Sequence, residues 1–251
     1  MDVAICIPAR LNSSRFPKKV LADLGGKTVL QRVFERAISA VKTGNVIILC
    51  DSSAVHDAAV NFGAPVIDTP ETCVSGTERI ASVLDKIRGD FIINIQGDEP
   101  FFDTDIIGKI VAKSRTSNAH IFTPVYKLDS VDDLLDSNRV KVVRGHNGRA
   151  LYFSRSTIPF VRDEENVSKW LKWTDFYGHV GIYGYRRKVL ENYTNLVPGK
   201  LESAEKLEQL RFLESGYAID TVETLRPSLG IDTPKDLTKA NALLANIQSS
   251  A

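Results

Sequence analysis

The feature that most constrains the fold is a regular alternation, over the first hundred residues, of short apolar runs and longer segments with helical spacing. The run from Val3 to Pro8 is typical of a buried strand, and the segment from Thr28 to about Ala40 spaces its apolar residues like a helix capped by Thr28. The pattern predicts further strands at 46–50, 65–68 and 91–95 and helices at 54–62, closed by Gly63, and 75–87. Alternation of this kind favours parallel strands joined by right-handed crossovers, as in a Rossmann-like half domain. The absence of a Gly-x-Gly-x-x-Gly fingerprint counts against a dinucleotide.

The pattern changes after a predicted helix at 103–113 and a strand at 121–126. His146-Asn147-Gly148 lies between apolar runs at 140–143 and 150–153, which is a strong hairpin signal, so we expect antiparallel additions to the sheet. The polar stretch 163–172 indicates a mobile loop. The remaining predicted elements are a strand at 177–185, a helix at 203–214, a strand at 218–222 and a last helix that opens at Asp232 with Thr233 as its cap.

Composition excludes several classes of function. The 251 residues suffice for one large α/β domain or two small ones, and a net charge of +1 recruits neither nucleic acid nor a membrane, so anions must be bound by local clusters. The three cysteines are widely spaced and indicate neither a zinc motif nor a disulfide framework. We see no signal peptide and no bilayer-spanning stretch, and expect a cytoplasmic protein.

A cationic loop follows the first predicted strand. It combines cations with small residues, and such a loop at a strand end suits phosphate oxygens, which backbone N–H groups and guanidinium groups can bind. A solvated basic loop is an equally good interpretation of the loop alone, and the pattern of a Walker loop is absent. The residues concerned are Ala9, Arg10, Ser13, Ser14, Arg15, Lys18 and Lys19.

Two aspartates are candidates for binding a metal ion. Asp98 follows a buried strand after Gly97, where open α/β sheets bind ligands, and a carboxylate there can hold Mg²⁺ on a phosphate. Asp232 precedes the last helix. Turn formation and helix capping remain the alternatives for both, and sequence spacing does not establish that they converge.

For several other polar side chains, the sequence leaves open whether they bind a ligand or have a structural role. Ser75, Gly76 and Arg79 at a helix start suit an anion or a nucleobase edge, but also a plain cap. Arg155 fits a carboxylate clamp or a surface ion pair, and His179, in an aromatic strand, is more often structural. Glu208 and Gln209 fit an exposed helix face.

Taken together and in order, these stretches resemble the sugar-acid cytidylyltransferases, and among them the family of 3-deoxy-manno-octulosonate (Kdo) cytidylyltransferases, also called CMP-Kdo synthetases. No single motif is specific, but their number and order are, and they extend from Ile7 to about Leu237. The motifs are Pro8-Ala9-Arg10, Ser13-Ser14-Arg15-Phe16-Pro17 with Lys19, Ser75-Gly76-Thr77-Glu78-Arg79, Asn94-Ile95-Gln96-Gly97-Asp98-Glu99-Pro100, Leu151-Tyr152-Phe153-Ser154-Arg155, His179 to Tyr185, Leu207 to Arg211 and Asp232-Thr233-Pro234.

The resemblance implies an enzyme that couples CTP to Kdo, giving CMP-Kdo and pyrophosphate for bacterial lipopolysaccharide. It implies a three-layer, Rossmann-like nucleotide-diphospho-sugar transferase fold with a mixed, mostly parallel sheet and a smaller antiparallel section. The whole chain, 1–251, would be one domain and a homodimer, with a nucleotide-binding half at about 1–127, a sugar-binding and dimerisation section at about 128–232, and a C-terminal helix at 233–251.

The resemblance also assigns roles to individual residues. CTP would be bound by Ala9, Arg10, Ser13, Arg15, Lys19, Ser75, Gly76 and Arg79, and the sugar acid by Gln96, Arg155, His179, Tyr183, Glu208 and Gln209, with Arg155 facing its carboxylate. Arg10, Lys19, Asp98 and Asp232 would be catalytic, and Asp98 and Asp232 would bind Mg²⁺. The sequence does not decide which group takes the proton of the sugar hydroxyl. The alternatives are a metal-bound water, an aspartate and no dedicated base.

The chain departs from the family at two positions. Lys18 stands where the family has glycine, which adds a side chain and a charge to the triphosphate loop. Gly178 stands where a large cationic residue is common, beside His179, so an 8-amino analogue of Kdo or a nonulosonate is an alternative substrate. A non-catalytic nucleotide-binding regulator is the alternative of a different class, but the presence of Asp98, Asp232 and Lys19 counts against it.

Overall fold

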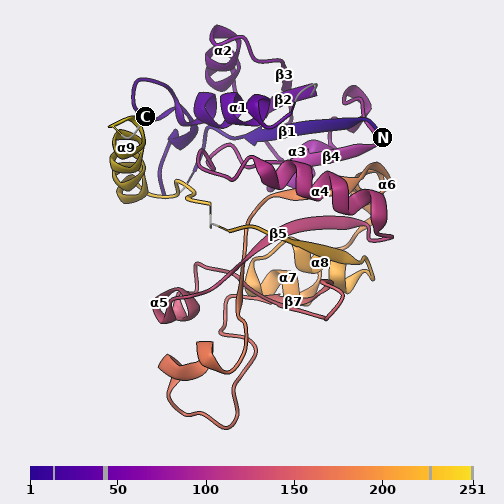
Figure 1. Ribbon diagram of the computed structural model, residues 1–251. Helices are drawn as coiled ribbons and strands as arrows, with labels where there is room; N and C mark the ends of the chain where they lie inside the picture. The colour runs from indigo at the N-terminus through magenta and orange to yellow at the C-terminus, as the bar shows by residue number, and fades with distance from the viewer. Residues whose placement is uncertain (14, 42–44, 226–227, 250–251) are drawn as a thin grey trace. The chain divides into compact units, whose positions relative to one another are not determined.

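The computed structural model describes residues 1–13, 15–41, 45–225 and 228–249, so Ser14 of the predicted phosphate loop lies outside the described residues. Contacts divide the chain into two compact units (Figure 1). Unit 1 comprises Met1–Gly108, Tyr185–Glu191 and Ser228–Ala251, and unit 2 comprises Lys109–Gly184 and Asn192–Pro227. The predicted functional division at about 127 and 232 stays a prediction.

Unit 1 contains a parallel sheet whose strands follow the order β3-β2-β1-β4. Its strands are apolar and mostly buried, as expected where helices cover both faces of a sheet. The bounds are β1 (Val3–Ala9), β2 (Asn45–Cys50), β3 (Val66–Asp68) and β4 (Phe91–Asn94). Because the order reverses between β1 and β4, right-handed crossovers place α1 and α2 on one face and α3 on the other.

The helices of unit 1 begin where polar caps predict them. The Thr28 hydroxyl accepts a hydrogen bond from Gln31 N, and the Ser75 hydroxyl accepts one from Glu78 N. The helix predicted over 75–87 is wrong in length: it ends at Ala81, since the Ser82 hydroxyl donates back to the carbonyl of Arg79 and a separate 3-10 turn follows at Leu84–Lys86. The bounds are α1 (Val29–Ser39), α2 (Ser53–Asn61), α3 (Gly76–Ala81), α6 (Arg187–Glu191) and α9 (Pro234–Ser249), with a further 3-10 turn at Lys19–Leu21.

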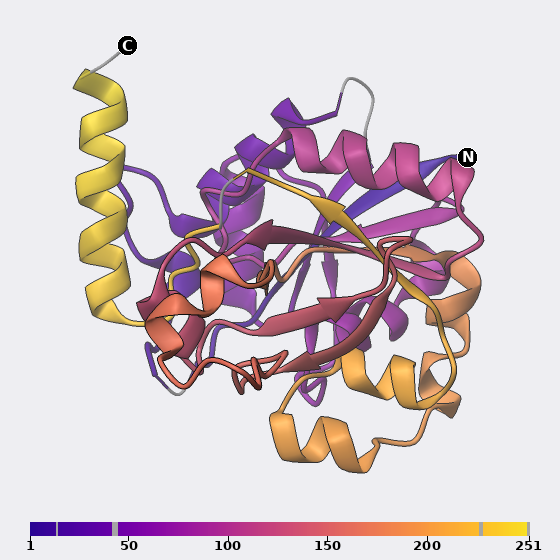
Figure 2. The ribbon, with the colours of Figure 1, turned by 60° about the horizontal axis from the view of Figure 1, so that its bottom comes forward.

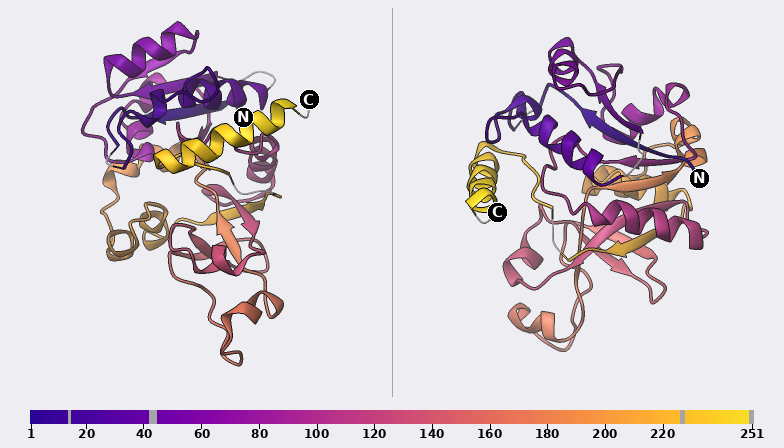
Figure 3. Two further views of the ribbon diagram at one scale, coloured as in Figure 1. Left: turned by 90° about the vertical axis from the view of Figure 1, so that its left-hand side faces the viewer. Right: turned by 45° about the horizontal axis from the view of Figure 1, so that its top comes forward.

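The C-terminal helix α9 belongs to unit 1 although it lies furthest from β1 in sequence. Leu24, Val29, Ile231 and Ala240 form one buried cluster, which ties α9 to the N-terminal segment beside α1 (Figure 3). The side-chain oxygen of Asn241 also accepts a hydrogen bond from Gly25 N at 3.1 Å. Residues 228–233, which precede α9, are therefore anchored next to the loop that follows β1.

Unit 2 has a mixed sheet in the order β10-β5-β8-β6-β7, in which only the β10–β5 pair is parallel. The predicted hairpin at 140–153 is confirmed as β6 and β7. Helices α7 and α8 lie side by side (Figure 2). The bounds are β5 (Ile121–Lys127), β6 (Lys141–Arg144), β7 (Ala150–Ser154), β8 (Tyr177–His179), β10 (Ile219–Glu223), α5 (Val131–Leu135), α7 (Lys200–Glu205) and α8 (Gln209–Glu214), with 3-10 turns at Val167–Lys172 and Tyr193–Asn195; α4 (Asp105–Thr116) and β9 (Tyr183–Arg186) run from one unit into the other.

Three predictions for the second half are corrected. The strand expected at 177–185 is two strands, β8 and β9, because the chain bends tightly where Ile182 N donates to the carbonyl of Val180. The helix expected at 203–214 is also two, because Lys206 takes a left-handed conformation with φ 55°. The polar stretch 163–172 contains a 3-10 turn that buries Trp170, whose indole N–H donates to the carbonyl of Glu164.

The predicted fold class, an α/β protein with mostly parallel strands and an antiparallel section, is confirmed. Among the residues that the structure describes, no helix is long and apolar enough to cross a membrane.

Candidate functional site

The reversal of strand order between β1 and β4 makes the carboxyl ends of these strands the expected ligand site of unit 1. A pocket of about 230 Å³ lies there, lined by the end of β1, the start of α3 and the loop after β4. It brings together predicted residues from four separate stretches of sequence. These are Arg10, Lys19, Ser75, Gly76, Arg79, Gln96 and Asp98.

Glycine at position 97 explains how the loop after β4 reaches the end of β1. A Cβ atom there would lie 2.9 Å from the carbonyl oxygen of Pro8, and Gly97 N donates a hydrogen bond to that oxygen at 3.2 Å. Only glycine permits this approach without a shift of backbone. The close contact carries Asp98, the next residue, to the loop that follows β1.

Lys19, Asp98 and Asp232 form the electrostatic centre of this region. The buried Lys19 ammonium donates to the carboxylate of Asp98 and, at 3.0 Å, to that of Asp232, so two carboxylates 134 residues apart converge on one point (232 − 98). Burial lowers the pKa of Lys19, but Asp98 and Asp232 outweigh this effect and raise it above its ordinary value. Burial likewise raises the pKa of Asp232, and the hydrogen bond from Lys19, with help from Arg15, brings it below the ordinary value.

The remaining predicted CTP-binding residues lie around this centre. Arg15 forms an ion pair with Asp232 at 2.9 Å, whereas the exposed Arg10 has no hydrogen bond or ion pair within the described part of the chain. Ala9 is the buried last residue of β1, and Ser13 is half-buried in the loop. Of the two cations, Arg15 is therefore engaged by Asp232, whereas Arg10 is available to an anion.

Arg79 is committed to protein partners. Its guanidinium donates to the Thr69 hydroxyl at 2.5 Å and to Asp51 at 3.1 Å, and its side chain is 2% exposed. Asp51 in turn accepts a hydrogen bond from Leu11 N. Arg79 thus ties the loops after β2 and β3 to the wall of the pocket, a positioning role that the sequence did not distinguish from ligand binding.

Two acidic residues of unit 1 were not among the predicted site residues. Asp51 follows β2 directly, the same signal that identified Asp98 after β4. Glu99 lies beside Asp98, and burial, together with the charge of Asp98, raises the pKa of Glu99 to about 7. The sequence contained both signals, but the contacts of neither residue can be deduced from it.

The carboxylates of unit 1 fit a magnesium ion by their chemistry. Mg²⁺ takes oxygen ligands and is commonly held by one or two carboxylates together with phosphate oxygens. Asp98 and Asp232 already converge on a cation, the Lys19 ammonium, so the same two side chains can share a divalent ion with a triphosphate.

The sugar-binding residues predicted in the second half belong to unit 2, whereas Gln96 lies in the pocket of unit 1. Arg155 is held by carbonyl oxygens: its Nε donates to Glu205 O at 2.8 Å and its Nη1 to Ser137 O at 3.1 Å. Carbonyl partners fix the guanidinium without neutralising it. The contacts therefore favour a clamp for an anionic group over the alternative of a surface ion pair.

His179 is a neutral side chain held by Thr123. The Thr123 hydroxyl lies 2.8 Å from His179 Nε2, 2.8 Å from the carbonyl of Ile182 and 3.2 Å from that of Val180. A hydroxyl has one proton, so Thr123 either donates to a carbonyl and accepts from Nε2–H, or donates to Nε2. Burial lowers the pKa of His179 to about 3, and the ring packs 5.3 Å from that of Tyr183.

Gln209 and Glu208 begin helix α8, which packs on β7. Gln209 is 3% exposed, and its Nε2 is buried with no hydrogen-bond partner among the described residues. A buried amide that lacks a partner is costly and points to a ligand or water. The prediction of an exposed helix face is therefore wrong for Gln209.

The space next to Gly178 is filled by Tyr126. A Cβ atom at Gly178 would lie 2.4 Å from Tyr126 Cζ, and Arg139 Nη1 donates to the Tyr126 hydroxyl at 3.1 Å. Position 178 thus has no cationic side chain, and the space beside it in unit 2 holds the ring of Tyr126, which the Arg139 guanidinium contacts. Sequence analysis found the gap at Gly178 but not the two residues that occupy it.

The chain is similar to known proteins over nearly its whole length. The family model for cytidylyltransferases matches residues 4–223. The 3-deoxy-manno-octulosonate cytidylyltransferase of Solibacter usitatus is 43% identical over 94% of this chain and 92% of its own, and that of Porphyromonas gingivalis is 42% identical over 97% and 96%. A solved structure of CMP:2-keto-3-deoxy-manno-octonic acid synthetase complexed with CTP superposes with a TM-score of 0.91 at 37% identity, covering 98% of this chain and 99% of that one.

Proposed function

The chain belongs to the cytidylyltransferase family, and from that premise we propose that it couples CTP to Kdo, giving CMP-Kdo and pyrophosphate. The observation that supports this function is the convergence of Lys19, Asp98 and Asp232 beside the pocket at the carboxyl ends of β1 and β4, where the strand order of unit 1 reverses. A cation between two carboxylates, together with Arg10, which has no ion pair among the described residues, suits a triphosphate with its metal ion.

The reaction needs positioning and charge stabilisation rather than a covalent intermediate. The 2-hydroxyl of the sugar acid attacks the α-phosphorus, the bond from this phosphorus to the bridging oxygen breaks, and pyrophosphate leaves with the electron pair. Negative charge accumulates on the α-phosphoryl and leaving oxygens. Arg10 and Lys19 stabilise this charge, and Arg79 holds the wall of the pocket. Ser75 and Gly76 line the same pocket at the start of α3.

We assign Mg²⁺ to Asp98 and Asp232. When bound, the ion neutralises phosphate charge that these residues alone would repel. Lys19, which contacts both carboxylates, would also be able to contact phosphate. Lys19 and, to a smaller extent, Arg15 hold the pKa of Asp232 below its ordinary value, so this carboxylate is ionised.

Unit 2 supplies the groups proposed for the sugar acid. Arg155 offers the carboxylate a guanidinium that has no ion pair among the described residues, Gln209 offers a buried amide donor, and His179 a neutral ring for a sugar hydroxyl. Tyr183 and Glu208 complete the set that we propose in unit 2. We propose Gln96 separately, as a sugar-binding residue of unit 1. We also propose, from the resemblance alone, a homodimer that acts in the cytoplasm and supplies lipopolysaccharide biosynthesis.

We propose Kdo over its 8-amino analogue or a nonulosonate because the relatives that are 42–43% identical over nearly the whole chain are named 3-deoxy-manno-octulosonate cytidylyltransferases. The guanidinium of Arg139 reaches the Tyr126 hydroxyl beside Gly178, but it is paired with Asp133 at 2.8 Å and does not replace the missing cation. The non-catalytic alternative has no comparable support, since Lys19, Asp98 and Asp232 are all in contact.

The test is pyrophosphate release from CTP and Mg²⁺ with Kdo, 8-amino-Kdo and a nonulosonate in parallel. We expect release mainly with Kdo. Release with another acid would retain cytidylyl transfer and overturn the substrate. If none of the three acids causes pyrophosphate release although the folded protein still binds CTP, the chain would be a nucleotide-binding regulator.

A further inference from the structure

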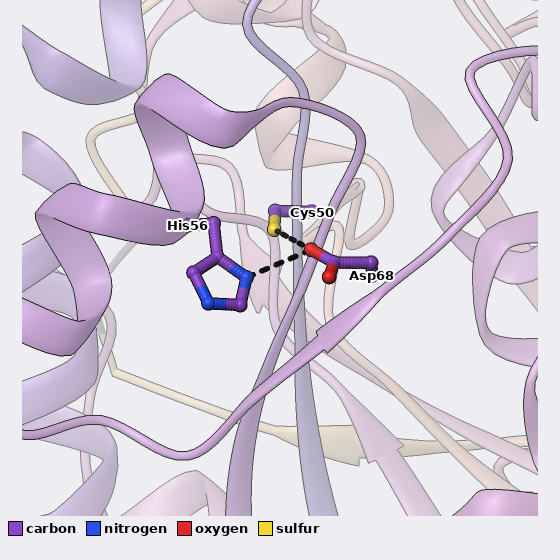
Figure 4. A group of neighbouring side chains, drawn as sticks. All are labelled: Cys50, His56 and Asp68. Carbon is purple, nitrogen blue, oxygen red and sulfur yellow. Dashed lines mark hydrogen bonds and ion pairs between the residues drawn. The ribbon is translucent and has the colours of Figure 1, made fainter.

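A thiol, an imidazole and a carboxylate meet in unit 1 apart from the residues assigned to CTP (Figure 4). Cys50 ends β2 and Asp68 ends β3, and the two are direct partners in the parallel register, so their side chains leave the sheet on the same side. Helix α2 follows β2 and brings His56 over them. The three ligand atoms all lie within 4.8 Å of one another, and Asp68 Oδ1 is 3.4 Å from Cys50 Sγ and 2.8 Å from His56 Nδ1.

We propose that Cys50, His56 and Asp68 bind one borderline-soft divalent cation of the Zn²⁺ class. Sulfur, imidazole nitrogen and carboxylate oxygen form a donor set that zinc takes in tetrahedral sites and that Mg²⁺ does not favour. Metal bonds of about 2.3 Å to sulfur and about 2.0 Å to oxygen at a tetrahedral angle separate the two ligand atoms by about 3.5 Å. The Sγ–Oδ1 distance of 3.4 Å already matches this edge.

The surroundings give the ion a route and a vacant position. A hollow of about 330 Å³ borders His56 and Asp68, whose side chains are 36% and 71% exposed, whereas Cys50 is fully buried beneath them. A cation entering from the hollow meets the carboxylate and imidazole first and the sulfur last. Three protein ligands leave the fourth tetrahedral position to water from the hollow.

Without a cation, two protons occupy this space. The Cys50 thiol and His56 Nδ1–H both donate to Asp68 Oδ1, and burial, reinforced by Asp68, raises the pKa of Cys50 to about 12. Binding of a divalent ion releases the thiol proton to solvent and moves the imidazole proton to Nε2. The ion then faces one thiolate and one carboxylate, so the site is electrically neutral.

The site would stabilise the edge of unit 1 that supports the pocket. It joins β2, β3 and α2, and the residues that follow two of the ligands, Asp51 and Thr69, are the partners of Arg79. Because the three ligands are not held together in the unfolded chain, an ion that binds the folded arrangement raises the free energy of unfolding by RT ln(1 + [ion]/Kd), so the gain grows with the logarithm of the ion concentration.

The experiment is titration of the metal-free full-length chain with Co²⁺, followed by the thiolate-to-cobalt charge-transfer absorption in the near ultraviolet. We expect one equivalent to bind, Zn²⁺ to displace it and excess Mg²⁺ to leave it bound. Cys50→Ser should abolish the absorption, and His56→Gln and Asp68→Asn should each weaken binding at least tenfold.

Two matched variants serve as controls. Asp57→Asn removes a carboxylate from the same hollow, and Cys73→Ser removes a thiol elsewhere in unit 1; both should bind Co²⁺ like the parent chain. Absence of the charge-transfer absorption in the parent chain, its survival in Cys50→Ser, or its loss in Asp57→Asn would overturn the proposal. His56 lies on a partly exposed helix face, so His56→Gln tests the site even where a change at the buried Cys50 impairs folding.

Discussion

The two units hold their candidate side chains in different ways. In unit 1, Lys19, Asp98 and Asp232 bind one another, so each charge is compensated by the next. In unit 2, carbonyl groups hold the Arg155 guanidinium, which has no ion pair among the described residues, and the Thr123 hydroxyl holds the neutral His179 ring. A ligand entering unit 1 must exchange existing ion pairs, whereas a ligand of unit 2 meets charge that is already free. Variants should therefore affect catalysis in unit 1 and binding in unit 2.

The largest expected effect is that of Asp98→Asn. Removing one carboxylate from the convergent pair should lower turnover about 100- to 1,000-fold, the size typical of a lost electrostatic group at a reacting centre. The free energy of unfolding should change by less than about 2 kcal/mol, because Lys19 keeps its contact with Asp232. Pyrophosphate release at saturating CTP and Kdo measures the first quantity and urea unfolding the second.

The matched control is Asp57→Asn, which removes an exposed carboxylate of α2 that does not line the 230 Å³ pocket. It should leave turnover unchanged. Near-normal turnover in Asp98→Asn would remove Asp98 from the proposed metal site. It would also contradict the expectation that variants of unit 1 affect catalysis.

Arg155→Ala should act on binding instead. Charge-assisted hydrogen bonds contribute about 1.5–3 kcal/mol, so the KM for Kdo should rise about 10- to 150-fold while the KM for CTP stays constant. Arg155→Lys should restore part of the loss, because it keeps the charge but not the two-pronged geometry. A fall in CTP affinity with unchanged KM for Kdo would contradict the clamp and its place in unit 2.

His179 provides a test by pH. Its pKa is about 3 in the folded chain and near 6.5 when unfolded, so the unfolded state binds more protons between these values. The stability that the neutral ring contributes is complete above about pH 6.5 and falls as the pH decreases. At pH 5 the loss should be about 1–2 kcal/mol, somewhat below the full linkage value because His179 is partly exposed.

Urea unfolding of the parent chain and of His179→Gln, at pH 7 and at pH 5, isolates this contribution. The other titrating groups are common to both proteins and cancel in the difference. Equal losses of stability in the two proteins between pH 7 and pH 5 would show that His179 is not held neutral.

Much of unit 1 was predictable because its determinants are local. Apolar runs fixed the parallel strands, polar caps fixed the helix starts, and the strand-end rule identified Asp98. What the sequence could not reveal depends on pairing between distant segments. The convergence of Asp98 with Asp232 arises from the packing of α9, and that of Cys50 with Asp68 from the register of β2 and β3.

Unit 2 was predicted less well for a related reason. Its helix α7 ends at Glu205 before the left-handed Lys206, and no residue type marks this break. The strand predicted at 177–185 is divided by a bend at Gly181, but a glycine alone does not distinguish a bend from a strand interior. The role of Tyr126 beside Gly178 depends on an antiparallel register that a gap in the family pattern cannot specify. The sequence showed that Gly178 differs from the family pattern, but it did not show that Tyr126 fills the space beside it.

The smallest expected effect compares one lysine in each unit. Lys18 and Lys206 both have left-handed backbones, with φ 58° and 55°, a conformation that costs a side-chain-bearing residue about 1–2 kcal/mol more than glycine. Glycine loses about 0.5–1 kcal/mol through its greater freedom when unfolded, so Lys18→Gly and Lys206→Gly should each raise the free energy of unfolding by about 0.5–1 kcal/mol. Urea midpoints should shift alike, because the backbone physics is the same. Only Lys18→Gly should change the KM for CTP, since Lys18 directly precedes Lys19 in the loop of unit 1. An equal change in that KM from Lys206→Gly would mean that nucleotide binding is not confined to the groups of unit 1.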